Sequence, residues 1–63
     1  MFTYKDVDGD EIYIQDERYA VEIELTGTDE NYVIVHLPHK ELPELIKYLQ
    51  GVYDAYDKKN NTT

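Results

Sequence analysis

The feature that most constrains the fold is an alternation of apolar and polar residues over residues 18–37. β-Branched residues recur at every second position, which predicts two half-buried strands in residues 18–30 and 31–37. Residues 26–31 supply the Gly, Asp and Asn that a turn between them requires. A hairpin of this kind has one apolar face and one solvent-facing face. The predicted inward residues are Val21, Ile23, Leu25, Val33, Val35 and Leu37.

A second hairpin is predicted in residues 1–17, and its register follows from the same rule. A three-residue loop at residues 7–9 pairs Tyr4 with Ile12 and keeps the apolar residues, which include Phe2 and Ile14, on one face. A two-residue loop would mix the two faces. The three-residue loop is a type I turn followed by a left-handed residue, the position that Gly9 occupies.

The hydrophobic period changes after Leu37. Apolar residues then recur at the spacing of one helical face: Leu42, Leu45, Ile46, Leu49, Val52, Tyr53 and Tyr56. Pro43 is tolerated only in the first turn, so the helix should begin near residues 39–41. The predicted fold is α+β, a four-stranded antiparallel β-meander (β-β-β-β-α) with one C-terminal helix packed on one face in two layers. We expect a single domain over residues 1–59 and a frayed tail at residues 60–63.

The charge of the chain is unevenly distributed. The formal net charge is −8, and residues 1–37 carry ten acidic side chains against two basic ones, while residues 38–63 are balanced. Such a field repels nucleic acids and anionic membranes and attracts basic proteins, although acidity also serves solubility. The absence of cysteine excludes a disulfide framework and a thiolate metal site. No apolar run reaches the length of a membrane span, so a cytoplasmic protein is expected.

Motifs for metal binding or catalysis are weak. Residues 6–10 resemble the start of an EF-hand loop, but Glu11 stands where that loop needs glycine, so a tight turn is predicted instead. His36 and His39 flank a predicted strand end and do not have a zinc-site spacing. The chain contains neither serine nor cysteine. We therefore predict no enzyme activity, no metal and no cofactor.

The predicted outer face of the sheet carries the most specific functional signal. Aromatic and aliphatic residues among carboxylates, on a face that the helix does not cover, are typical of a partner-binding surface, although isolated exposed apolar residues also occur in ordinary strands. The predicted partner-binding residues are Glu11, Tyr13, Glu22, Glu24, Tyr32, Ile34 and His36.

These observations predict a small acidic non-enzymatic binding protein. It would present the acidic sheet face to a basic, nucleic-acid-binding surface of a protein partner and inhibit that partner, without binding nucleic acid or membrane itself. In size and charge the chain resembles phage-encoded inhibitors of host nucleic-acid enzymes. One alternative is a homodimeric structural or assembly module that uses the same face or an edge strand. Another is an antitoxin-like regulator of a basic protein with no nucleic-acid role.

Overall fold

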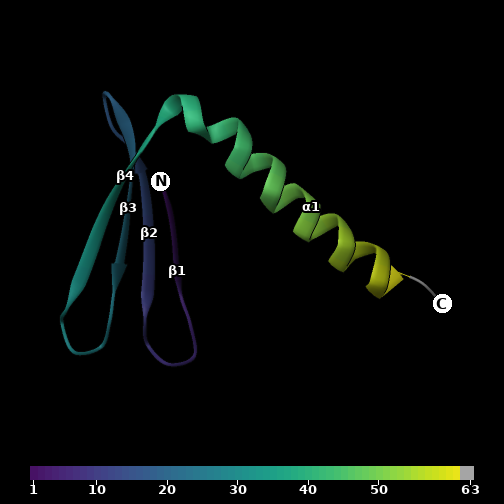
Figure 1. Cartoon of the computed structure of the whole chain (residues 1–63). Coiled ribbons are helices and arrows are strands. Elements are labelled where there is room, and N and C mark those ends of the chain that lie inside the picture. The colour runs from purple at the N-terminus through teal and green to yellow at the C-terminus, as the bar shows by residue number, and fades with distance from the viewer. Residues whose placement is uncertain (62–63) are drawn as a thin grey trace.

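The computed structural model describes residues 1–61 and shows one antiparallel sheet followed by one long helix (Figure 1). The strand order β1-β2-β3-β4 is that of a simple meander. The predicted α+β class and its β-β-β-β-α order are confirmed. The elements are β1 (Phe2–Lys5), β2 (Glu11–Asp16), β3 (Ala20–Thr26), β4 (Tyr32–Pro38), a 3-10 turn η1 (His39–Glu41) and α1 (Leu42–Asn61).

The strand register matches the predicted pairing of β1 with β2, and in the pairing of β3 with β4 it sets the predicted inward residues opposite one another. Tyr4 is paired with Ile12, Ile12 with Leu25, and Leu25 with Val33. Because side chains alternate along a strand, this register places all predicted inward residues on one side. We call this side the apolar face, and it consists of Phe2, Tyr4, Ile12, Ile14, Val21, Ile23, Leu25, Val33, Val35 and Leu37.

The turn between β1 and β2 has the predicted three-residue form. The amide of Asp6 donates to the carbonyl of Asp10 (2.9 Å), and the amide of Gly9 donates to the carbonyl of Asp6 (3.1 Å). Gly9 has a φ of 88°, a conformation that costs glycine little. The Asp6 carboxylate also accepts hydrogen bonds from the amides of Asp8 and Asp10. The acidic segment that resembles a calcium loop is therefore a glycine-dependent turn.

The turn between β3 and β4 repeats this hydrogen-bond pattern without a glycine in the left-handed position. The amide of Gly27 donates to the carbonyl of Asn31 (2.9 Å), and the amide of Glu30 donates to the carbonyl of Gly27 (3.1 Å). Glu30 has a φ of 70°, so it occupies the position that Gly9 holds in the first turn. A left-handed conformation costs a non-glycine residue about 1–2 kcal/mol. This strain is a feature that the sequence did not reveal.

Replacing Glu30 with glycine is expected to stabilise the protein by about 0.5–1 kcal/mol. The gain is smaller than the strain relieved because glycine also adds freedom to the unfolded chain. The free energy of unfolding in urea measures the effect. Glu30→Gln is the matched control, since it removes the same charge but keeps the Cβ atom. If the glutamine variant is stabilised as much as the glycine variant, charge and not backbone conformation is responsible.

The same turn makes one aspartate more acidic than usual. The carboxylate of Asp29 accepts hydrogen bonds from the side chain (2.8 Å) and the amide (3.1 Å) of Asn31, and these bonds lower the pKa of Asp29, the side-chain bond most of all. Because the pKa is lower in the folded than in the unfolded state, the stability that this group contributes is present above the unfolded-state pKa. It is lost as the pH falls through the folded-state pKa.

We expect a carboxyl titration followed by NMR to place the pKa of Asp29 below that of an ordinary aspartate. In Asn31→Ala the pKa should rise towards the ordinary value because the strongest hydrogen-bond donor is gone. The other aspartates of the same variant serve as internal references. An Asp29 pKa that is unchanged by the substitution would contradict the assigned cause.

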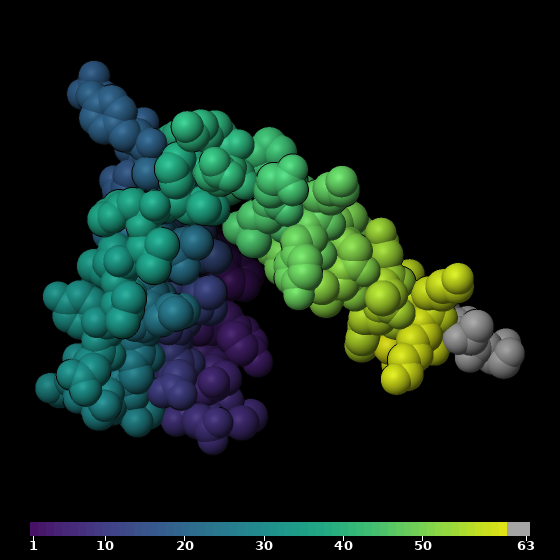
Figure 2. Space-filling model, in the orientation of Figure 1, coloured from purple at the N-terminus to yellow at the C-terminus, as the bar shows by residue number. Residues whose placement is uncertain are grey.

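The position of α1 differs from the expected two-layer packing. The helix leaves the end of β4 and runs away from the sheet, and its close contacts are chiefly with η1 (Figures 1 and 2). Leu42 and Leu45 are half-buried, but the rest of the apolar stripe of the helix is exposed. Among the described residues only Val21 is a buried hydrophobic side chain, with 9% of its surface exposed. The expectation that the helix packs on one face of its own sheet is therefore not met in the single chain.

The local start of the helix explains this direction. Pro38 is still extended (φ −58°, ψ 142°), and the 3-10 turn begins at the next residue. The chain therefore turns within the three residues of η1, and the helix that follows diverges from the sheet (Figure 1). As predicted, helical structure begins at His39 and Pro43 falls in the first turn of α1. The helix continues to Asn61 and so includes two residues of the expected tail, while residues 62–63 lie outside the described residues.

Candidate interaction surface

The face opposite the apolar face carries all seven predicted partner-binding residues. The register across β2, β3 and β4 forms three rows on this side. We call it the acidic face, and its rows are Glu11–Thr26–Tyr32, Tyr13–Glu24–Ile34 and Gln15–Glu22–His36. The central row places one carboxylate between an aromatic ring and an aliphatic side chain. A charge and two apolar contacts are thus adjacent on one surface.

The side chains of the acidic face differ in depth. Tyr13, Glu22 and Glu24 are half-buried on the central strands β2 and β3. The β4 residues are more exposed: 61% for Tyr32 and 38% for Ile34. Glu11 and His36 are exposed at opposite ends of the face. The carboxylates therefore stand on the rigid centre of the sheet, and a large exposed ring lies at its edge.

Hydrogen bonds between neighbouring side chains order part of this surface. The Tyr13 hydroxyl donates to Oε1 of Gln15, and Nε2 of Gln15 donates to Oε1 of Glu17 (2.9 Å). The Thr26 hydroxyl donates to Oε2 of Glu24 (3.4 Å). Gln15 and Thr26 were not predicted as site residues, although their alternation with Tyr13 and Glu24 would have placed them on this face. A side chain that is held before binding loses less conformational entropy when a partner docks.

The charge of the acidic face is little neutralised from within. Nζ of Lys5 lies 3.9 Å from Oε1 of Glu11, and both side chains are well exposed. An exposed pair of this kind contributes little and is screened by salt. Glu22 and Glu24 lie two residues apart on β3, which separates their Cα atoms by about 7 Å along the strand. They form a pair of like charges on a fixed spacing.

One end of the acidic face is hollowed beside the β2–β3 turn. A shallow depression of about 540 Å³ is lined by Glu17, Arg18, Tyr19, Ala20, Glu22 and His36. The Arg18 guanidinium lies 5.3 Å from the centre of the Tyr19 ring, a cation–π distance. The tight connection between Glu17 and Ala20 (2.9 Å from amide to carbonyl) brings these turn residues beside Glu22. The sequence prediction missed them because it assigned no register to this hairpin.

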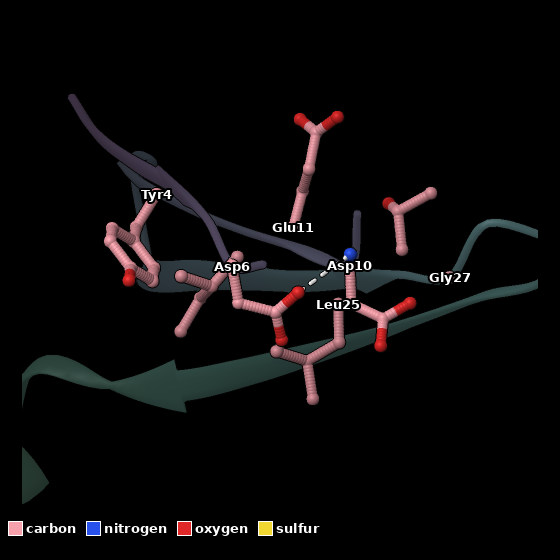
Figure 3. Close-up of a pocket in the computed structure, with 8 residues that line it drawn as sticks. Tyr4, Asp6, Asp10, Glu11, Leu25 and Gly27 are labelled. Carbon is pink, nitrogen blue, oxygen red and sulfur yellow. Dashed lines mark hydrogen bonds between the residues drawn. The ribbon is translucent and has the colours of Figure 1, made fainter. Parts of the chain in front are cut away.

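A second depression, of about 440 Å³, lies at the other end of the sheet (Figure 3). Its apolar lining comes from Tyr4, Ile12 and Leu25 of the apolar face. The turn residues Asp6, Asp10 and Gly27 and two residues of the acidic face, Glu11 and Thr26, complete the lining. The bond drawn in Figure 3 joins the Asp6 carboxylate to the Asp10 amide, so this carboxylate is used to hold the turn. The depression therefore lies at the end of the sheet that carries the turns, and residues of both faces line it.

The two histidines lie in different parts of the structure. His36 belongs to the acidic face, opposite Glu22 on β3. Nε2 of His39 lies 2.6 Å from Oδ1 of Asp16, which joins the start of the helical segment to the end of β2. This contact was not predicted. Within residues 1–61, no three His, Cys, Asp or Glu side chains converge closely enough to hold a metal ion.

Comparison of the chain with models of protein families, with curated proteins and with solved structures yields no match. Over the part of the chain that the structure describes, no helix has the length and apolar character needed to cross a membrane.

Proposed function

We propose that this protein is a small non-enzymatic binding protein whose acidic face docks on a basic surface of a partner protein. The observation that carries the proposal is the convergence of Tyr13, Tyr32 and Ile34 with Glu11, Glu22 and Glu24 on one side of the sheet. The aromatic and aliphatic groups supply contact area that loses water on binding. The carboxylates steer the partner and set its register.

The proposed partner surface is one that binds nucleic acid in the partner's own activity. Lysine and arginine side chains that contact phosphates also form charge-assisted hydrogen bonds with carboxylates. Glu22 and Glu24 on a central strand present two such acceptors at a fixed spacing, as a nucleic-acid backbone presents its phosphates. The protein then acts as an inhibitor, because the occupied groove no longer accepts nucleic acid. Inhibitors of this kind that phages encode provide the model for this activity.

The depression beside the β2–β3 turn gives the proposed contact a defined anchor. Glu17 and Glu22 contribute carboxylates to its lining, and Tyr19 contributes an aromatic ring that is 80% exposed. The Arg18 guanidinium already lies over the Tyr19 ring, so a basic side chain of the partner would pair with the carboxylates of Glu17 and Glu22 and lay its apolar stem along the depression. We therefore place one basic side chain of the partner here.

An affinity experiment with a nucleic-acid competitor tests the proposal. The immobilised protein is exposed to a nuclease-treated lysate of its native host at low salt, and bound proteins are eluted with rising NaCl. We expect a basic protein that is released by salt and displaced by added duplex DNA or RNA. A partner released by salt but indifferent to nucleic acid would favour the antitoxin-like alternative. If no basic protein is retained, the proposed function is wrong.

A further inference from the structure

Two complementary apolar surfaces of the chain have no partner among residues 1–61. One is the apolar face of the sheet, where Val33 is 60% and Val35 is 49% exposed. The other is the helix stripe, which we define as Ile46, Leu49, Val52, Tyr53 and Tyr56 and whose members are all more than half exposed. Figure 2 shows open space between the helix and the sheet. Exposed apolar surfaces of this extent mark an interface.

The accessible surface area of the chain is larger than that of a compact folded monomer of the same mass. It is 5688 Å² for a mass of 7.5 kDa. A compact folded monomer of this mass exposes about 4,200 Å², so the chain exposes about 1,400 Å² too much. Two chains that cover this excess would bury about 2,900 Å² in total. That area lies in the range of obligate homodimers, roughly 2,000–5,000 Å².

The connection between β4 and α1 disfavours closure of the helix onto its own sheet. β4 ends at Pro38 and α1 begins at Leu42, so only the three residues of η1 join the two elements. This 3-10 turn already bends the chain back and leaves α1 diverging from the sheet (Figure 1). All three of its residues are held in helical geometry, so closure of the remaining angle onto the same sheet would require the turn to unwind. A short connection instead favours exchange of the element between two chains.

The charge distribution favours packing of the helix on the partner's sheet over packing of sheet on sheet. The sheet half, residues 1–37, carries the whole net charge of −8, whereas residues 38–63 are neutral. Packing of one sheet directly on another would bring two strongly acidic halves together. Packing of the neutral helix on the partner's sheet avoids this repulsion. The dimensions also agree, since a helix of 20 residues is about 30 Å long and a strand of seven residues is about 23 Å.

From these observations we infer that the protein forms a two-fold homodimer in which α1 of each chain covers the apolar face of the other. This arrangement supplies each sheet with the helical layer that the single chain lacks. It uses the apolar face and not the acidic face or an edge strand, so both acidic faces stay accessible. The inference is independent of the proposed function and holds whatever the acidic face binds.

Two measurements on the protein test the inference. One is its mass in solution, and the other is whether contacts between helix and sheet join two different chains. Sedimentation equilibrium should give about twice the monomer mass of 7.5 kDa. A 1:1 mixture of ¹³C-labelled and unlabelled protein, unfolded and refolded together, should show filtered NOEs between Leu49 or Val52 of one chain and Val33 or Val35 of the other. A monomer would overturn the inference. So would a dimer whose helix–sheet NOEs are all within one chain or absent.

A pair of charge insertions on α1 provides the matched comparison. Leu49→Glu puts a charge into the helix stripe and is expected to raise the dimer dissociation constant by about 100-fold or more. Gly51→Glu adds the same charge on another side of the helix, where a side chain at residue 51 meets nothing within 4 Å, and the dimer should persist. Equal weakening by both would show that charge alone acts and would overturn the inference. If Leu49→Glu does not fold, the NOE experiment on the wild type still decides.

Salt separates this dimer from an electrostatic complex. Each chain carries a net charge of −8, so added NaCl screens the repulsion between copies and should strengthen the dimer. A complex of the acidic face with a basic partner should weaken under the same conditions. A dimer that dissociates as NaCl rises would contradict the proposed apolar interface.

Discussion

The double substitution Glu22→Lys with Glu24→Lys is expected to weaken binding of the basic partner by about 100-fold or more. It replaces two carboxylates on the central strand β3 with two ammonium groups, so attraction to lysine and arginine becomes repulsion. Both side chains are half-buried, and a lysine stem can lie along the sheet with its charged end in water. The fold should therefore survive. The dissociation constant for the partner retained in the affinity experiment is the measured quantity.

A control with the same change of net charge isolates the position of the charges. Glu41→Lys with Glu44→Lys alters η1 and the first turn of α1, away from the acidic face. We expect this variant to keep most of the affinity and to lose only the part due to long-range steering. The neutral pair Glu22→Gln and Glu24→Gln should lie between the wild type and the lysine variant. If both reversals weaken binding equally, the acidic face is not the contact surface.

Substitution of Gly9 by alanine is expected to destabilise the protein by about 1–2 kcal/mol. Gly9 has a φ of 88°, which alanine adopts only with strain. A Cβ atom on Gly9 would also lie 2.8 Å from Cγ2 of Thr28, so the Thr28 side chain has to move. The free energy of unfolding in urea measures the loss.

Two further variants separate the contributions at this turn. Gly9→Asn should cost less than Gly9→Ala, since asparagine tolerates the left-handed region better. Gly9→Ala combined with Thr28→Ser removes the methyl group at 2.8 Å and shows how much of the loss is steric. An unfolding free energy that is the same in Gly9→Ala as in the wild type would contradict the left-handed turn. A full recovery in the double variant would assign the effect to the contact with Thr28.

The sequence by itself determined the strands, the register of the β1–β2 and β3–β4 hairpins and the first turn. Alternation with period two decides which residues share a face, and a shift of one residue would move Ile12 and Leu25 to the wrong side. Gly9 marked its turn because only glycine accepts that conformation without cost. The start of the helix followed in the same way from Pro43. These features depend on interactions between residues that are near in sequence or directly paired.

Only the tertiary structure decided three features: the position of α1, the strain at Glu30 and the contact between His39 and Asp16. The helical period shows that one side of α1 is apolar, but it does not show which apolar surface that side will meet. The direction in which the chain leaves η1 decides where that side points, and it is seen only in the tertiary structure (Figure 1). Glu30 adopts its left-handed conformation because the strand pairing on both sides of the turn imposes it. The strand register alone places the seven predicted residues on the acidic face. Tyr19 lies beside that face because of the β2–β3 turn, whose geometry had no sequence signature.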